Sequence, residues 1–157
     1  MDHSPRRTLA ALLLALIPVG AATAQVVVSV SAGSFKPEDR IEAKVINKDR
    51  LPVSYCIELG QWSPHAGTVE STPVPFYVER KNHDNWNVLL IGPDIGSSRQ
   101  PATLSPGTSS EFSFRLHDIG EIRLVLHYWI GERDNVCKGS TKGSKTAKSK
   151  LFSILKD

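Results

Sequence analysis

The two cysteines of the chain, Cys56 and Cys137, have the most readily predicted chemistry. In an oxidising compartment two such thiols are expected to pair. The disulfide would enclose a loop of about 80 residues, for which the loop-entropy model gives roughly 4 kcal/mol of stabilisation. We therefore predict a Cys56–Cys137 disulfide. Two free thiols are the alternative.

Metal-binding and catalytic motifs are missing from the sequence. Downstream of residue 24 the histidines are His65, His83, His117 and His127, and no compact His-x-His or Cys-x-x-Cys spacing joins them into a metal site. The single methionine is Met1, so the axial ligand of a blue-copper site is lacking. There is no Gly-x-Ser-x-Gly, and "IGPDIG" lacks the lysine of a phosphate loop. We predict no metal, no cofactor and no enzymatic activity.

A lysine-rich stretch follows the second cysteine. From Lys138 to the C-terminus there are six lysines and one acid, whereas residues 25–137 carry more acidic than basic side chains, so the net charge of +3 is unevenly distributed. An anionic polymer is one candidate partner, bound by Lys138, Lys142, Lys145 and Lys148. A solvated connecting loop over Lys138–Lys150 is the alternative that we favour. Nucleic acid is disfavoured, because no aromatic residue interrupts the lysines to stack on bases.

A second candidate for binding is the segment "GQWSPHAGTVESTPVP", residues 60–75, which has the composition of a loop. Trp62 and His65 lie within it. Aromatic side chains on loops often anchor protein or glycan partners, so we take these two residues as candidate binding residues. The alternative is that Trp62 simply covers one end of the folded domain.

The N-terminal 24 residues are typical of a secretory signal peptide. Arg6 and Arg7 precede the apolar run Leu9–Val19, and the small residues Ala22-Thr23-Ala24 end it. The run is shorter than the roughly 20 residues of a membrane span. We expect cleavage after Ala24 and export to the periplasm or the extracellular space, by the general secretory route, with the twin-arginine route as the alternative. Residues 25–157 then form one domain, a length that fits a single core.

Alternation of apolar and polar residues dominates the mature chain and predicts strands. In "EFSFRL", the residues Phe112, Phe114 and Leu116 share one face. In "EIRLVLHYWI", a face from Ile122 to Ile130 is apolar, and the length of this run favours a central strand. Pro106-Gly107 predicts a type II turn. Strands are expected at 25–32, 40–48, 51–59, 75–81, 85–91, 111–116, 121–130 and 150–156.

Seven or eight strands without helical crossovers predict an all-β fold, an antiparallel β-sandwich, with a closed barrel as the alternative. The segments "VINKDRLPVSY", "FYVERKNHDNWNVL" and "LSPGTSSEFSFRLHDIGEIRLVLHYW" resemble the bacterial immunoglobulin-like domains of exported proteins. This resemblance covers most of the mature chain and implies an immunoglobulin-like sandwich. It assigns no active residue.

Two functions agree with these features. The first is an exported, non-catalytic binding module that presents loops to a protein or glycan partner, with residues 60–75 and the lysine-rich stretch as candidate contacts. The second is an inhibitor of a secreted protease, which would insert a loop into an active-site cleft.

Overall fold

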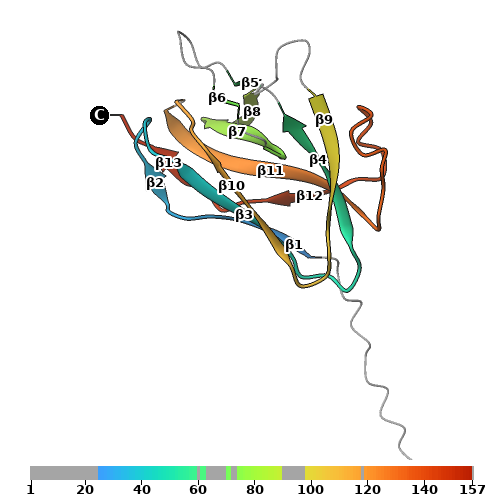
Figure 1. Cartoon of the computed structure of the whole chain (residues 1–157). Coiled ribbons are helices and arrows are strands. Elements are labelled where there is room, and N and C mark those ends of the chain that lie inside the picture. Colours follow the sequence, from blue (N-terminus) through green and yellow to red (C-terminus); the bar gives the residue numbers. More distant parts are fainter. Residues whose placement is uncertain are drawn as a thin grey trace, which may run out of the picture.

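The computed structural model describes residues 25–59, 61–62, 70–71, 74–89, 98–117 and 119–156. The predicted signal peptide, residues 1–24, lies outside the described residues, as does His65. Within the described ranges, all regular secondary structure is β (Figure 1). No helix with the length and hydropathy of a membrane span occurs in this part of the chain.

The first sheet contains three antiparallel strands in the order β1-β3-β10, with β1 at Val26–Val30, β3 at Ile41–Asn47 and β10 at Ser109–Phe114. In the middle strand, Ile41, Ala43 and Val45 are buried and the alternate side chains are more exposed. This alternation is the period-two pattern of a strand with one face on a core, as the sequence predicts.

The second sheet is organised around β11, Gly120–Ile130. Along one side β11 pairs with β7 (Phe76–Asn82) and then with β4 (Val53–Leu59). Along the other it pairs with β13 (Phe152–Ile154) and then with β12 (Lys145–Lys148). Strand β9 (Ser98–Leu104) extends the sheet beyond β4, β8 (Asn85–Leu89) pairs with β7, and β2 (Ser34–Phe35) pairs in parallel with β13. A separate two-stranded pair joins β5 (Gln61–Trp62) to β6 (Glu70–Ser71).

The two larger sheets pack face to face and enclose one hydrophobic core (Figure 1). Edge-to-face aromatic contacts cross the interface: the Phe112 ring of the first sheet lies 5.4 Å from Phe76 and 6.4 Å from Tyr55 of the second, centroid to centroid. Seven principal strands make up the sandwich when β12 and β13 are taken as one. Strands β1, β3 and β10 form the first sheet, and β4, β9, β11 and the β12–β13 pair belong to the second. This is the arrangement of an immunoglobulin-like sandwich, with β7 and β8 inserted as a hairpin.

All eight predicted strands are present, and β11 is central as expected. Gly107 has a φ of 73°, the conformation that the predicted type II turn requires after Pro106. Sequence reasoning missed β9, which contains Pro101. The proline is accommodated because β9, among the described strands, pairs only with β4 and so lies at an edge.

The prediction of a connecting loop over Lys138–Lys150 is correct for residues 138–144 and wrong for Lys145–Lys148. These four residues form β12, which pairs with Val125–Tyr128 of β11. Ala147 is buried opposite Leu126, so the short strand contributes to the core. One small apolar residue between lysines was too weak a pattern to predict this pairing.

The buried side chain of Asn47 joins the two sheets where β3 ends. Its Nδ2 donates to the backbone carbonyls of Leu51 and Leu104, at 2.9 Å each, and its Oδ1 accepts a hydrogen bond from the Asp49 N–H. Asn47 is 0 % exposed, so water cannot replace these bonds. Asn47 is therefore a structural link between β3, the turn into β4, and β9.

We expect Asn47→Ala to lower the free energy of unfolding by about 2–4 kcal/mol, because it leaves two carbonyls and one N–H without their partner. Asn87→Ala, which changes an exposed asparagine of β8, should alter it by less than about 0.5 kcal/mol. Urea denaturation followed by circular dichroism measures both. Equal midpoints for the two variants would show that the Asn47 bonds contribute little.

Candidate functional site

The outer face of β11, turned away from the sandwich core, is unexpectedly well covered. It carries Arg123, Val125, His127 and Trp129. This face includes an arginine and a histidine, yet Val125 is 4 % exposed and Trp129 is 5 % exposed. Both faces of the central strand are therefore shielded from water.

Trp129 is covered by the segment 131–144 between β11 and β12, here called the cover loop, drawn in orange-red in Figure 1. Its Cys137 is disulfide-bonded to Cys56 of β4, with the two Cα atoms 5.1 Å apart, which confirms the predicted pairing. Val136, next to the cysteine, is buried. The disulfide thus anchors the loop over the outer face of the sheet.

Hydrogen bonds from side chains of β4 and β11 to its backbone hold the cover loop at further points. Ser54 of β4 is fully buried, and its Oγ donates to the Gly131 carbonyl and accepts from the Arg133 N–H, both at 2.9 Å. The Trp129 indole N–H donates to the Lys142 carbonyl at 3.3 Å. The loop is consequently fixed at its start, near its middle and near its end.

A pocket of about 110 Å³ lies beside the disulfide, and we call it the disulfide pocket. Its walls come from four strands and from two segments far apart in the sequence. They are formed by Cys56, Glu58, Val74, Pro75, Phe76, Tyr77, Arg99, His127, Trp129, Val136, Cys137, Gly139, Ser140 and Thr141.

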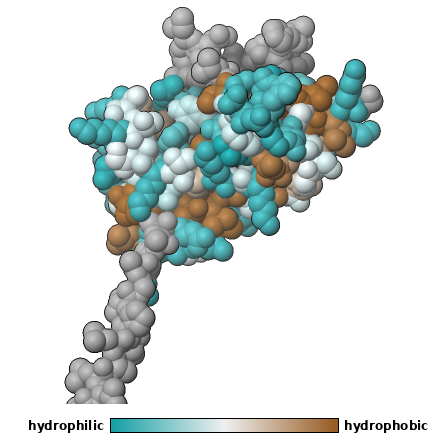
Figure 2. Space-filling view, turned by 180° about the vertical axis from the view of Figure 1, so that it is seen from behind, coloured by the Kyte–Doolittle hydropathy of each residue, from teal (hydrophilic) through white to brown (hydrophobic). Residues whose placement is uncertain are grey.

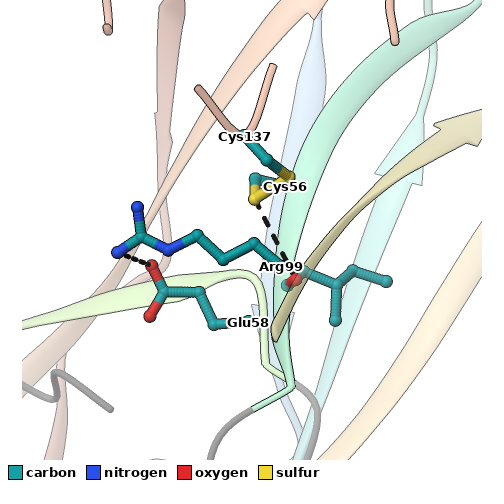
Figure 3. Close-up of a disulfide and its surroundings, with 5 residues drawn as sticks. Cys56, Glu58, Arg99 and Cys137 are labelled. Carbon is teal, nitrogen blue, oxygen red and sulfur yellow. Dashed lines mark hydrogen bonds and ion pairs between the residues drawn. A yellow bond between two sulfur atoms is a disulfide. The ribbon is translucent and has the colours of Figure 1, made fainter. Parts of the chain in front are cut away.

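An ion pair lies at the edge of this pocket. Arg99 of β9 and Glu58 of β4 are cross-strand neighbours, and their charged groups are 3.1 Å apart (Figure 3). The side chains are 42 % and 20 % exposed, so the pair contributes little to stability. The pair places the guanidinium of Arg99 as a hydrogen-bond donor and the carboxylate of Glu58 as an acceptor next to the disulfide. These two groups are suited to orienting a polar ligand.

His127 forms part of the pocket wall. Its ring lies 5.3 Å from the Tyr77 ring in a T-shaped contact, and its Nδ1 is 3.5 Å from the Ser144 Oγ. Burial lowers the pKa of His127 below its ordinary value, and the charge of Lys148 lowers it further, whereas Glu79 acts in the opposite direction. The imidazole is therefore held towards its neutral form.

A charged cluster adjoins His127 on the same face. Arg123 donates to Glu79 through Nε at 2.6 Å, and the Lys148 ammonium is 3.5 Å from the same carboxylate. The guanidinium of Arg123 also lies 3.6 Å from the centroid of the Trp86 ring. Trp86 lies half-buried on the outer face, opposite Lys81 in the β7–β8 hairpin.

The four candidate lysines do not form one patch. Lys138 and Lys142 lie exposed in the cover loop. On β12, Lys148 pairs with Val125, whose side chain points away from the core. Lys145 pairs with Tyr128, whose side chain points towards the core. The two lysines therefore project to opposite faces of the sheet. Register thus separates residues that the sequence suggested as a group.

Of the other two candidate binding residues, His65 lies outside the described residues. Trp62 lies in β5, paired with Glu70, and its side-chain position is not described. Both stay predictions. Sequence reasoning missed Tyr77, which is 41 % exposed, and Arg99. Tyr77 could have been found, because it alternates with the inward Phe76 and Val78.

Among the described residues, no group of three histidine, cysteine, aspartate or glutamate side chains is arranged to hold a metal ion. The surface seen in Figure 2 is mixed, with separate hydrophobic patches bordered by hydrophilic residues.

No protein-family model and no curated protein matches the chain. Among solved structures, one match is the sporulation control protein Spo0M from Bacillus subtilis, at 14 % identity and a TM-score of 0.39, covering 85 % of this chain and 50 % of that one. The chain thus spans about half the length of the Spo0M chain. Another is the ASH/PapD-like domain 7 of human CEP192, at 11 % identity and a TM-score of 0.35, covering 98 % of this chain and 99 % of that one.

The lowered pKa of His127 predicts a pH-dependent contribution to stability. The pKa of His127 is lower in the folded than in the unfolded state, so the neutral imidazole contributes to the free energy of unfolding. That contribution is fully present above the unfolded pKa of about 6.5 and is lost as the pH falls through the folded pKa. We therefore expect the free energy of unfolding, measured in urea, to fall between about pH 7.5 and pH 5. In the His127→Gln variant the free energy of unfolding should fall less over the same pH range, because this position no longer titrates.

Titration by NMR gives a sharper test of the cause. Lys148→Gln should raise the pKa of His127 and Glu79→Gln should lower it, because their charges act in opposite directions. Lys156→Gln, an exposed change near the C-terminus, serves as the control and should leave it unaltered. A His127 pKa equal to that of histidine in an unstructured peptide contradicts the interpretation.

Proposed function

We propose that this chain is an exported, non-catalytic interaction module that binds a protein or glycan partner at the disulfide pocket and the surface around it. One observation carries the proposal. Val74 and Pro75, at the end of segment 60–75, line the same pocket as Cys137, Gly139, Ser140 and Thr141, at the start of the lysine-rich stretch. Residues from the ends of two segments selected from the sequence as binding loops thus lie at one pocket.

The chemistry of this surface suits recognition. Tyr77 is an aromatic side chain exposed over 41 % of its area, and tyrosine is enriched among residues that dominate binding energies. His127, Glu58 and Arg99 surround it with hydrogen-bonding groups. A ligand would therefore find an aromatic anchor with a polar border, the usual arrangement of a protein or glycan contact.

Export is supported by the predicted signal peptide together with the Cys56–Cys137 disulfide. A compartment that keeps thiols oxidised would preserve the cover loop in its anchored position. The binding surface and the proposed location are thus coupled through one covalent bond.

Inhibition of a secreted protease is the second candidate, and the fixed cover loop is the observation that favours it. A loop held by a disulfide and by backbone hydrogen bonds enters a cleft without a large loss of conformational freedom. Titration of secreted proteases with the oxidised chain separates the two candidates. Near-stoichiometric inhibition of one protease would establish an inhibitor, and unchanged activity of all of them would leave the interaction module.

The proposal predicts that Tyr77→Ser weakens binding of the partner at least tenfold, because it removes the aromatic anchor. The partner is isolated on immobilised, oxidised residues 25–157, and its affinity for each variant is measured by surface plasmon resonance.

Leu155→Ser is the matched control, since Leu155 is a 52 % exposed apolar residue of the C-terminal segment. It should bind as the unaltered chain does. Equal affinities of the Tyr77 and Leu155 variants would place the interface elsewhere. Failure to isolate any partner, on the column or on an array of glycans, would contradict the function itself.

A further inference from the structure

A second pocket, of about 180 Å³, lies on the other side of the Val136–Ser140 segment, and we call it the cationic pocket. It shares Trp129, Val136 and Ser140 with the disulfide pocket. Its remaining walls are formed by Arg133, Asn135, Lys138 and Lys142, all from the cover loop. Three basic side chains and no acidic one line it.

Four other basic residues on this side of the molecule are neutralised by carboxylates. Lys81, Arg99, Arg123 and Lys148 each contact a carboxylate. Within the described residues, the side chains of Arg133, Lys138 and Lys142 have no ion pair. Their positive charge therefore remains available to a ligand.

The backbone that carries these cations is already fixed. Arg133 N–H is bonded to Ser54, Cys137 is cross-linked next to Lys138, and the Lys142 carbonyl accepts the Trp129 indole N–H. Gly139 has a φ of 82°, which lets the loop turn back so that Lys138 and Lys142 line one pocket. Because the loop is ordered beforehand, a ligand need not meet the cost of ordering it.

We propose that the cationic pocket binds a tetrahedral oxyanion, the phosphate or sulfate group of a larger ligand. Arginine can donate two parallel hydrogen bonds to such a group, and each lysine adds a positive charge. The amide of Asn135 and the hydroxyl of Ser140 are further donors at the wall. The inference deepens the proposed function, on which it rests for the identity of the molecule that bears the anion.

The burial of Trp129 decides between classes of anionic ligand. At 5 % exposure its ring offers no face on which a base could stack. Single-stranded nucleic acid relies on such stacking as well as on charge. The pocket therefore fits a discrete phosphate or sulfate group better than a nucleic-acid strand.

Titration calorimetry with sodium phosphate and sodium sulfate, at constant ionic strength, tests the proposal on oxidised residues 25–157. The variant Arg133→Gln/Lys138→Gln/Lys142→Gln should lose at least tenfold in affinity for the oxyanion. The substitution at Lys142 leaves the backbone carbonyl that Trp129 contacts, and circular dichroism checks that the variant is folded.

The matched control is Lys145→Gln/Lys150→Gln/Lys156→Gln, which removes the same three charges from exposed lysines outside the pocket. It should bind within twofold of the unaltered chain. Equal losses in both triple variants would show that only net charge matters and would overturn the site. Acetate binding as tightly as phosphate would overturn the specificity for a tetrahedral group.

The relative affinities for phosphate and sulfate identify the ester that the natural ligand carries. Since inorganic ions are used, this experiment does not depend on the partner. If the unaltered chain does not bind either oxyanion but the Tyr77 variant loses affinity for the partner as expected, the cationic pocket alone is overturned. If the oxyanions bind as expected but the Tyr77 variant keeps its affinity for the partner, the proposed interface alone is overturned.

Discussion

The cross-link between Cys56 and Cys137 is the constraint on which the rest of the functional surface depends. Trp129 projects from the outer face of β11, and residues of the cover loop enclose it. The disulfide and the bonds of Ser54 hold that loop in place, although much of its own sequence is polar. A single covalent tie thus adds a third layer to part of a two-layer sandwich.

Both candidate pockets are consequences of this layer. The disulfide pocket forms where the loop meets β4, β7 and β9, and the cationic pocket forms within the loop against Trp129. The first offers an aromatic and hydrogen-bonding surface, and the second offers positive charge without neutralising carboxylates. Since they share the Val136–Ser140 segment, one ligand with an anionic group could occupy both.

Sheet register determines which charges act together on this face. Glu79, Arg123 and Lys148 come from β7, β11 and β12, yet they form one cluster because their strands are adjacent. Lys145 is only three residues from Lys148 and projects to the opposite face. The positive charge that appears continuous along the sequence is therefore divided into a neutralised part on β12 and a free part in the cover loop.

The sequence by itself predicted the fold class, eight of the strands and the disulfide. Alternation in stretches such as "EFSFRL" reports burial directly, and two cysteines allow one intramolecular pairing. Only the tertiary structure decided that β9 and β12 are strands, that Glu58 faces Arg99, and that Arg133 joins Lys138 and Lys142 around one pocket. The physical reason is that a period of two tells which residues share a face of a strand, whereas the choice of neighbouring strand and register depends on contacts between residues far apart in the chain.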